Sequence, residues 1–380
     1  MPLHPPLALY IHWPFCVSKC PYCDFNSHVR DSVDMEAWQQ ALLADLAYEA
    51  KQIPGRTLGS IFFGGGTPSL MPPAIAGALI EAAGQHWDMA ADCEITLEAN
   101  PSSVEASRFA DLARAGVNRI SIGLQSLDDQ ALRFLGRAHG VDEALAAIAV
   151  AQSQFERVSV DLIYARPGQS QADWAAELNR ALALGTGHLS LYQLTIEPGT
   201  RFETLVRTGE FAPLETEEAA EMFELTREIT AAQGIPAYEV SNHARAGQES
   251  RHNLTYWRYG SYMGIGPGAH GRRGGLATMR HKKPENFLSA VARNGQGGQS
   301  ETALTPQEQA REALVMGLRL AEGVDLGRIR TATGMNSLIH PDQAKMLARE
   351  GLITRSGDHI TVTPAGMLLL DAILVALVSV

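Results

Sequence analysis

The feature that most constrains the fold is a regular alternation of short apolar runs with amphipathic stretches over the first two thirds of the chain. The amphipathic stretches have helical periodicity, and the apolar runs have the length of strands. This rhythm predicts a parallel sheet with crossover helices. The expected strands are residues 7–12, 60–63, 94–98, 118–123, 158–164, 188–194 and 237–240. The expected helices are residues 35–51, 74–86, 104–115, 171–184 and 216–233, with further helical pattern up to about residue 152.

About six or seven strand–helix units fit into this length, which is fewer than a closed eight-unit barrel needs. We therefore expect an α/β fold in the form of a partial (β/α)6-type barrel. A doubly wound sheet is the alternative, because periodicity alone does not distinguish the two arrangements.

The pattern changes after the last expected strand. Residues 243–284 are rich in Gly, Arg, His and aromatic residues and have weak periodicity. The segment after residue 336 then predicts a helix, a turn at Gly351, two short strands (352–354 and 360–363) and a terminal helix, the order of a small winged-helix-like module. We expect a barrel over residues 1–240, an irregular connecting segment over 241–300 and a C-terminal helical and winged-helix-like domain over 301–380.

Composition and charge exclude several classes of protein. Of the 380 residues, 45% are hydrophobic and 19% are charged, and the net charge is -11. Such an acidic chain is not expected to bind nucleic acid through bulk positive charge. Residues 1–6 lack the basic and apolar parts of a signal peptide, and no apolar run is long enough to span a bilayer. With four cysteines, three of them in one short segment, the chain does not resemble a disulfide framework, so we expect a cytoplasmic protein.

Three of the cysteines lie in a C-x₃-C-x₂-C run directly after the first expected strand. They are Cys16, Cys20 and Cys23, and the fourth cysteine, Cys93, is far away in the sequence. Three thiolates from one loop can hold three irons of a four-iron cluster and leave the fourth iron open. The spacing differs from that of common zinc sites, in which paired cysteines recur and a fourth ligand completes a tetrahedron. The run therefore predicts an iron–sulfur site.

Other polar or glycine-rich segments also follow expected strands. Because the carboxyl ends of parallel strands meet at one edge of a sheet, these segments are expected to gather there with the cysteine loop. A glycine triplet allows close approach of a ligand to the backbone, and an arginine can pair with a carboxylate through its planar fork. The segments are Gly64–Gly65–Gly66–Thr67–Pro68, Glu98–Ala99–Asn100–Pro101, Gln125–Ser126, Gly136–Arg137 and Asp161–Leu162–Ile163–Tyr164.

Taken together, these motifs resemble the radical S-adenosylmethionine (SAM) superfamily. More narrowly, they resemble the branch that holds oxygen-independent coproporphyrinogen III oxidase (HemN) and the heme chaperone HemW. The resemblance covers most of the chain, including the C-terminal module. It implies a [4Fe–4S] cluster on Cys16, Cys20 and Cys23, with SAM bound at the open iron and cleaved to a 5′-deoxyadenosyl radical by an electron from the cluster.

The same resemblance implies a set of SAM-lining residues. Glu98 would hold the amine of the methionine part and Arg137 its carboxylate, while Gln125 and Asp161 would take the ribose hydroxyls. Tyr22 would contact the adenine. The full set is Tyr10, Tyr22, Gly65, Gly66, Thr67, Glu98, Gln125, Arg137 and Asp161.

Two features favour the HemW side of this branch. HemN-type oxidases carry a further cysteine two residues after the third ligand, where this chain has Asp24–Phe25, and they also have an N-terminal extension. The segment His252–Asn253–Leu254–Thr255–Tyr256–Trp257 resembles the H-N-x-x-Y-W motif of HemW proteins, which is linked to heme binding. A neutral imidazole is a good axial ligand for iron, and nearby aromatic rings can cover a porphyrin face.

The resemblance thus implies a heme chaperone that binds a [4Fe–4S] cluster, SAM and heme, and that delivers heme to hemoproteins. His252 is the candidate heme ligand, with His243 and His270 as rivals. An electron donor, peripheral membrane contact and a homodimer complete the expected partners, and the basic run from Arg272 to Lys283 is a candidate surface for heme propionates or an anionic membrane.

Two alternatives use the same residues. The first is an enzyme that decarboxylates the propionates of coproporphyrinogen III by radical chemistry. The second is a zinc module that combines the three cysteines with His12 or His28.

Overall fold

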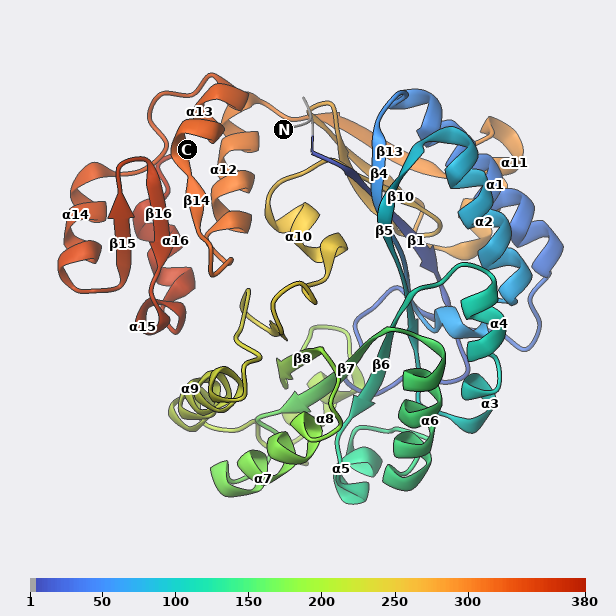
Figure 1. Ribbon diagram of the computed structural model, residues 1–380, viewed down its shortest axis with the longest axis horizontal. Helices are drawn as coiled ribbons and strands as arrows, with labels where there is room; N and C mark the ends of the chain where they lie inside the picture. Colours follow the sequence, from blue (N-terminus) through green and yellow to red (C-terminus); the bar gives the residue numbers. More distant parts are fainter. Residues whose placement is uncertain (1–4) are drawn as a thin grey trace.

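Six consecutive parallel strands form the centre of the sheet in the computed structural model, which describes residues 5–380. Their spatial order follows their order in the sequence, β1-β4-β5-β6-β7-β8 (Figure 1). A doubly wound sheet would reverse direction at a switch point, so this sequential order confirms the partial barrel. The strands are β1 (Leu7–Trp13), β4 (Thr57–Gly65), β5 (Asp88–Ala99), β6 (Arg119–Gln125), β7 (Arg157–Tyr164) and β8 (His188–Gln193).

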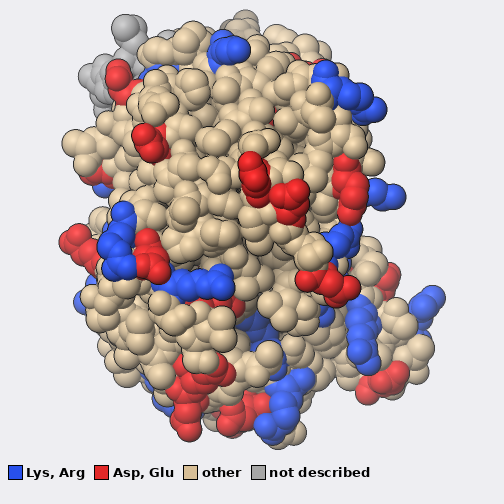
Figure 2. Space-filling view, turned by 90° about the vertical axis from the view of Figure 1, so that its right-hand side faces the viewer, with Lys and Arg blue, Asp and Glu red and all other residues tan. Residues whose placement is uncertain are grey.

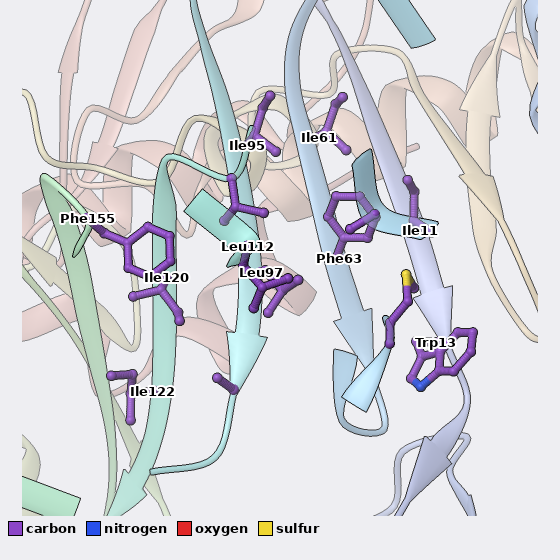
Figure 3. Close-up of a cluster of buried hydrophobic side chains, with 14 of the residues drawn as sticks. Ile11, Trp13, Ile61, Phe63, Ile95, Leu97, Leu112, Ile120, Ile122 and Phe155 are labelled. Carbon is purple, nitrogen blue, oxygen red and sulfur yellow. The ribbon is translucent and has the colours of Figure 1, made fainter. Parts of the chain in front are cut away.

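Side chains alternate between the two faces of these strands. One face carries large apolar residues that form the main core, drawn in Figure 3, among them Ile11, Phe63 and Leu97. The residues between them are largely polar, such as Ser60, Glu94 and Arg119, and they point to the inner side of the sheet. Since side chains alternate with a period of two, this pattern gives the sheet an apolar outer face and a polar inner face, which we call the lumen.

Helices cover the outer face, as Figure 1 shows along the convex side of the sheet. The first and longest helix, α1, begins at the N-cap Asp34, whose side chain accepts a hydrogen bond from the N–H of Ala37. Charges of both signs are interspersed over the side turned to the viewer in Figure 2. The covering helices are α1 (Met35–Gln52), α2 (Pro73–His86), α3 (Ser103–Ala106), α4 (Phe109–Arg114), α5 (Asp129–Phe134), α6 (Val141–Gln154), α7 (Gln171–Leu182) and α9 (Thr216–Ala232).

The segment expected to be irregular after residue 240 is largely regular, so that expectation is wrong. Its strand β10 pairs in parallel with β1, and three antiparallel strands extend the sheet beyond it. These strands are short and rich in Gly and Arg, so the alternation of apolar and polar residues that marks a strand is not recognisable in the sequence. The elements are β9 (Asn242–Ala244), α10 (Arg251–Trp257), β10 (Tyr262–Ile265), β11 (His270–Arg273), β12 (Leu276–Arg280), α11 (Pro284–Asn294) and β13 (Gly298–Ala303).

The C-terminal module has its own core and a three-stranded antiparallel sheet of order β14-β16-β15. Its helix and strand–turn–strand order agrees with the expected winged-helix-like arrangement. The elements are α12 (Pro306–Gly317), β14 (Val324–Asp325), α13 (Leu326–Thr333), α14 (Pro341–Arg349), β15 (Ile353–Ser356), β16 (His359–Val362), α15 (Pro364–Met367) and α16 (Leu370–Leu377).

Three further differences from expectation are local. Residues 237–240 form no strand, and the chain instead pairs at β9, antiparallel to β8, with Ala237 in one isolated bridge to His243. A short helix, α8 (Arg201–Arg207), was not expected, because seven residues give little periodicity. The helical pattern of residues 104–115 is divided between α3 and α4.

Of residues 1–6, which lack the features of a signal peptide, residues 1–4 lie outside the described residues. Among residues 5–380, every helix is too short or too polar to cross a membrane.

The expectation of an exposed basic surface from Arg272 to Lys283 is wrong for the arginines of this run. Arg280 is 1% exposed and pairs with Asp45 and Glu49 of α1. Arg273, also buried, pairs with Glu49 and Glu301. Arg272 binds both carboxylate oxygens of Glu312, each at 2.9 Å. These guanidinium groups are therefore committed to internal ion pairs, and Lys282 and Lys283 are the exposed cations of the run.

Candidate functional site

The cysteine loop leaves the carboxyl end of β1 and brings three thiols together at that edge of the sheet. Cys16 lies in the short strand β2 (Phe15–Cys16), which pairs with β3 (His28–Val29) and closes the loop. All three thiols are free and partly exposed, and burial raises the pKa of Cys16 and Cys23. Cys93 is buried in the main core, away from the loop, and its pKa is raised to about 12 by burial.

The glycine triplet at the end of β4 packs directly against this loop. A Cβ on Gly66 would lie 2.7 Å from the carbonyl oxygen of Phe15 and 3.0 Å from Sγ of Cys16. Gly65 has a φ of +116°, a conformation that side chains disfavour. The hydroxyl of Thr67 donates a hydrogen bond of 3.4 Å to Sγ of Cys16. The glycines thus allow the contact between β4 and the cysteine loop, and Thr67 supplies a donor to the sulfur.

Two carboxylates, Glu98 and Asp161, face the lumen near this edge. Both are enclosed by protein atoms but keep some access to solvent. Burial, followed by the nearby charge of Asp161, raises the pKa of Glu98 to about 8. Burial also raises the pKa of Asp161, although hydrogen bonds from Ser190 and Ser121 oppose the shift. Glu98 accepts a hydrogen bond of 3.2 Å from the N–H of Gly65. Two neighbouring carboxylates in one lumen favour a cationic ligand.

Arg137 comes to the same edge from the loop after α5. Its guanidinium donates to Sγ of Cys20 at 3.5 Å, to Oδ1 of Asn100 at 2.5 Å and to the carbonyl of Gly123 at 3.0 Å. We expect Arg137 to bind a ligand carboxylate through the planar fork of its guanidinium. One nitrogen of that fork already donates to Asn100 and Gly123, so the fork is only partly available to a ligand. Asn100, which also donates to Thr67 at 3.3 Å, was missed as a site residue, although Glu98–Ala99–Asn100–Pro101 was noted as a motif.

Tyr22 and Gln125 lie on the same side of the site as Arg137. The ring of Tyr22 packs 6.3 Å from that of Phe202, in a small apolar cluster under α8. Gln125 ends β6 with a φ of 68°, which is unusual for a residue other than glycine. A Cβ on Gly123 would lie 2.9 Å from Nε2 of Gln125, so the absence of a side chain at Gly123 leaves room for this amide.

Tyr10 begins a hydrogen-bonded chain that fixes the cysteine loop. Its hydroxyl lies 3.0 Å from Nδ1 of His12, and Nε2 of His12 lies 2.9 Å from the carbonyl of Asn26. The amide of Asn26 donates to the carbonyls of Pro267 and Lys282, both at 2.9 Å. Asn26 could not be selected from the sequence, because the two carbonyls that its amide binds lie more than 200 residues away.

A glycine-rich turn after β10 packs against the cysteine loop and supports it. A Cβ on Gly266 would lie 2.4 Å from the carbonyl oxygen of His12, and one on Gly268 would lie 2.6 Å from the amide of Asn26. The repeated glycines at positions 264, 266 and 268 were the available signal for this contact.

His252 lies away from the cysteine edge, on α10. This helix runs along the inner side of the sheet, between the strands and the C-terminal module (Figure 1). His252 as a residue is 6% exposed, and its imidazole lies 4.9 Å from the ring of Phe62 and 6.1 Å from that of Tyr10. Burial, with a smaller effect of Arg119, lowers the pKa of His252 to about 3.

The two rival histidines differ sharply in their surroundings. His243 in β9 is 1% exposed, and burial lowers its pKa to about 3. His270 lies on β11 and is exposed. The structure therefore separates the three histidines rather than bringing them together.

The histidines nearest the cysteines are engaged by other groups. Both ring nitrogens of His12 are in the chain described above, and Nε2 of His28 lies 3.2 Å from Oδ1 of Asn26. Among residues 5–380, no group of three or more His, Cys, Asp or Glu side chains is arranged around a single metal ion. A four-iron cluster binds each thiolate at a different iron, so it does not require such an arrangement.

Comparisons with known proteins agree with this geometry. The radical SAM superfamily model matches residues 10–181, and the HemN C-terminal domain model matches residues 304–369. The heme chaperone HemW of Escherichia coli K12 is 39% identical over 97% of this chain and 97% of its own length. The HemW of Bacillus subtilis is 34% identical over 95% of this chain and 96% of its own.

A mitochondrial relative and a solved structure complete the comparison. Radical S-adenosyl methionine domain-containing protein 1 of Bos taurus is 39% identical over 98% of this chain and 87% of its own length. The structure of coproporphyrinogen III oxidase (HemN) of Escherichia coli superposes with a TM-score of 0.81 over 98% of this chain and 90% of that one, at 23% identity, which shows the shared fold. The chain therefore belongs to the radical SAM superfamily, in the branch that contains the heme chaperone HemW.

Proposed function

We propose that this protein is a cytoplasmic heme chaperone on a radical SAM scaffold, which binds a [4Fe–4S] cluster, SAM and heme and delivers heme to hemoproteins. The observation that carries the proposal is the meeting of three free thiols with Glu98, Asp161 and Arg137 at one edge of the barrel, in a chain whose HemW relatives align over nearly its full length. Reduced thiols of this kind persist in a reducing compartment.

Cys16, Cys20 and Cys23 would each bind one iron of the cluster and leave the fourth open. Their surroundings fit such a group. Thr67 and Arg137 donate hydrogen bonds to two of the sulfurs, and hydrogen bonds of this kind tune the potential of iron–sulfur centres. The space beside Cys16 exists because Gly66 has no Cβ.

SAM would lie between the cysteine loop and the lumen. Glu98 would accept hydrogen bonds from the amine of SAM. Asp161 would accept hydrogen bonds from the ribose hydroxyls, and Gln125 would donate hydrogen bonds to them or accept hydrogen bonds from them. The raised pKa of Glu98 indicates a carboxyl group that gains from a cationic partner. Arg137 would share its guanidinium between Asn100 and the carboxylate of the methionine part. Tyr10, Tyr22, Gly65, Gly66 and Thr67 would complete the wall. When bound, the cluster supplies one electron to SAM.

Heme would be held through His252. Its pKa of about 3 keeps the imidazole neutral at physiological pH, which is the form that binds iron. The rings of Phe62, Tyr10 and Tyr256 pack next to the imidazole, and rings of this kind can pack against a porphyrin once space opens beside it.

The test is an anaerobic reconstitution with iron and sulfide, followed by titration with SAM and then with heme. We expect visible charge-transfer absorption from the cluster, a spectral change on adding SAM, and a Soret shift on adding heme. The heme shift should be lost or altered in His252→Ala but kept in His270→Ala, since His270 lies on β11, outside the H-N-x-x-Y-W segment. Transfer of the heme to an apo-hemoprotein tests delivery.

Two results would contradict the proposal. The first is an absence of iron and acid-labile sulfide in protein handled without oxygen. The second is anaerobic conversion of coproporphyrinogen III to protoporphyrinogen IX, which would assign the protein to the oxidases of this branch.

A further inference from the structure

Helix α10, which carries the H-N-x-x-Y-W residues, is held at its start by a carboxylate from the sheet. Oε1 of Glu94 in β5 accepts hydrogen bonds from the N–H groups of Arg251 at 3.0 Å and His252 at 3.3 Å. It also lies 3.5 Å from the hydroxyl of the N-cap residue Ser250. Glu94 thus satisfies backbone donors that the first turn of a helix leaves free.

The same carboxylate is part of a buried ion pair. Oε2 of Glu94 lies 2.7 Å from the guanidinium of Arg157 and 3.9 Å from that of Arg119. Arg157 in turn donates to the carbonyl of Glu249 at 2.9 Å and to the side chain of Gln248 at 3.2 Å. Glu94 is 1% exposed, so these contacts are shielded from water. Together, these contacts fix residues 248–252 to strands β5 and β7.

The opposite end of α10 has weaker contacts. Arg258 pairs with Glu322 of the C-terminal module, and both side chains are half exposed. The indole N–H of Trp257 is buried without a hydrogen-bond partner among the described residues, which costs free energy while the helix is seated. The buried polar contacts of the helix itself therefore lie at its amino-terminal end, while its other end is joined to the C-terminal module by partly exposed groups.

This arrangement shields His252 from a large ligand. With 6% of the residue exposed and Phe62 and Tyr10 against its ring, no porphyrin can reach the imidazole while α10 is in place. Ser60 also lies 3.4 Å from Nδ1. A heme iron needs one ring nitrogen and open space for the macrocycle beside it.

We propose that α10 is a latch that must leave the sheet before heme reaches His252, and that Glu94 is the positioning residue that holds it closed. The part of this proposal that concerns heme depends on the proposed function. The part that concerns the movement of α10 does not.

The first experiment measures amide hydrogen exchange of residues 251–257 in the full-length protein without heme. In Glu94→Gln we expect exchange to accelerate by about tenfold or more, because a buried charge pair loses one partner. Exchange in β12 and β13, which make no contact with Glu94 or its two arginine partners, should stay unchanged. Glu322→Gln is the matched control: it breaks the exposed pair at the other end of α10 and should change exchange by less than about threefold.

A second variant keeps the test decisive if Glu94→Gln does not fold. Ser250→Ala removes the cap of α10, which accepts the N–H of Asn253 at 3.3 Å, and leaves the Glu94–Arg157 pair intact. It should accelerate exchange of the helix by about fivefold. Exchange of α10 equal to wild type in every variant that folds would overturn the latch.

The second experiment follows heme association by stopped-flow absorption. Wild type should bind slowly, at a rate that becomes independent of heme concentration, and Glu94→Gln should bind faster with the same final Soret spectrum. Equal association rates in the two proteins would overturn the role of Glu94. If wild type shows no heme spectrum at all, the proposed function fails, while the exchange experiment still decides whether α10 is a latch.

Discussion

In the buried pair between Asp45 and Arg280, the guanidinium Nε lies 3.0 Å from both carboxylate oxygens. Asp45 also accepts hydrogen bonds from the N–H groups of Gly266 and Gly297, at 3.2 and 3.0 Å. One carboxylate on α1 therefore holds the glycine-rich turn that supports the cysteine loop.

The first prediction concerns this carboxylate. Asp45→Asn leaves the buried Arg280 with Glu49, a carboxylate that Arg273 also binds, as its remaining charged partner, so the free energy of unfolding should fall by about 3–5 kcal/mol. Urea unfolding of the apo-protein measures it. Glu285→Gln, which breaks the exposed pair with Arg30, serves as control and should cost about 0–1 kcal/mol. Equal losses in the two variants would contradict the buried network as a source of stability.

The second prediction concerns the cysteines. Ser in place of Cys16, Cys20 or Cys23 should abolish the visible charge-transfer absorption after reconstitution and reduce bound iron to the background level, because each thiolate holds its own iron. Cys93→Ala should retain both, since this thiol lies in the core. Iron and sulfide assays on the same samples measure the result. Normal iron content in any one of the three serine variants would exclude that cysteine as a ligand.

The third prediction concerns Asn26. Asn26→Ala removes the two hydrogen bonds that tie the cysteine loop to Pro267 and Lys282, so the cluster should release iron to a chelator several-fold faster. Asn118 is a matched control, since its side-chain amide also makes two bonds, both at 2.8 Å, but to Cys93 and Ile95 in the middle of β5, away from the cysteine loop. Iron release from Asn118→Ala should equal that of wild type. A faster release in both variants would show a general loss of stability instead.

The fourth prediction concerns pH and SAM. The pKa of Glu98 is raised to about 8, so the carboxyl group is largely protonated at pH 7 in the ligand-free protein. Binding of an ammonium group favours the carboxylate, hence a proton is released. Affinity for SAM should rise with pH up to about 8 and then level off. Calorimetry in buffers of different ionisation enthalpy measures the proton release, which should vanish in Glu98→Gln. A flat pH profile in wild type would contradict this role of Glu98.

Much of the barrel was predictable because its information is local. The expected strand at residues 158–164 and helix at residues 171–184 correspond closely to β7 and α7, where apolar periodicity and a capping box at Ser170 agree. The extension after residue 240 was not predictable in this way. Its strands are three to six residues long, and Arg273 and Arg280 are buried only because α1 offers carboxylates from a distant part of the chain.

The site shows the same division. Cys16, Gly66 and Glu98 could be selected because each follows a strand, and parallel strands end at one edge. Asn26 and Glu94 could not, since a single Asn in a loop or Glu in a strand has no pattern of its own. The contacts by which Asn26 holds Pro267 and Glu94 holds His252 span more than 150 residues, and only the folded chain brings these partners near.

In the described chain, hydrogen bonding across the large sheet runs from β13 to β9 in one open arc. A ring of strands has a circumference set by its strand number and stagger, and it resists widening. An arc carries no such constraint, because its two ends are free to part without any loss of pairing between strands. The width of a ligand that the inner side of the sheet can admit therefore depends on the segments that lie across this opening, and variation in those segments would change that width while the cysteine edge keeps its geometry.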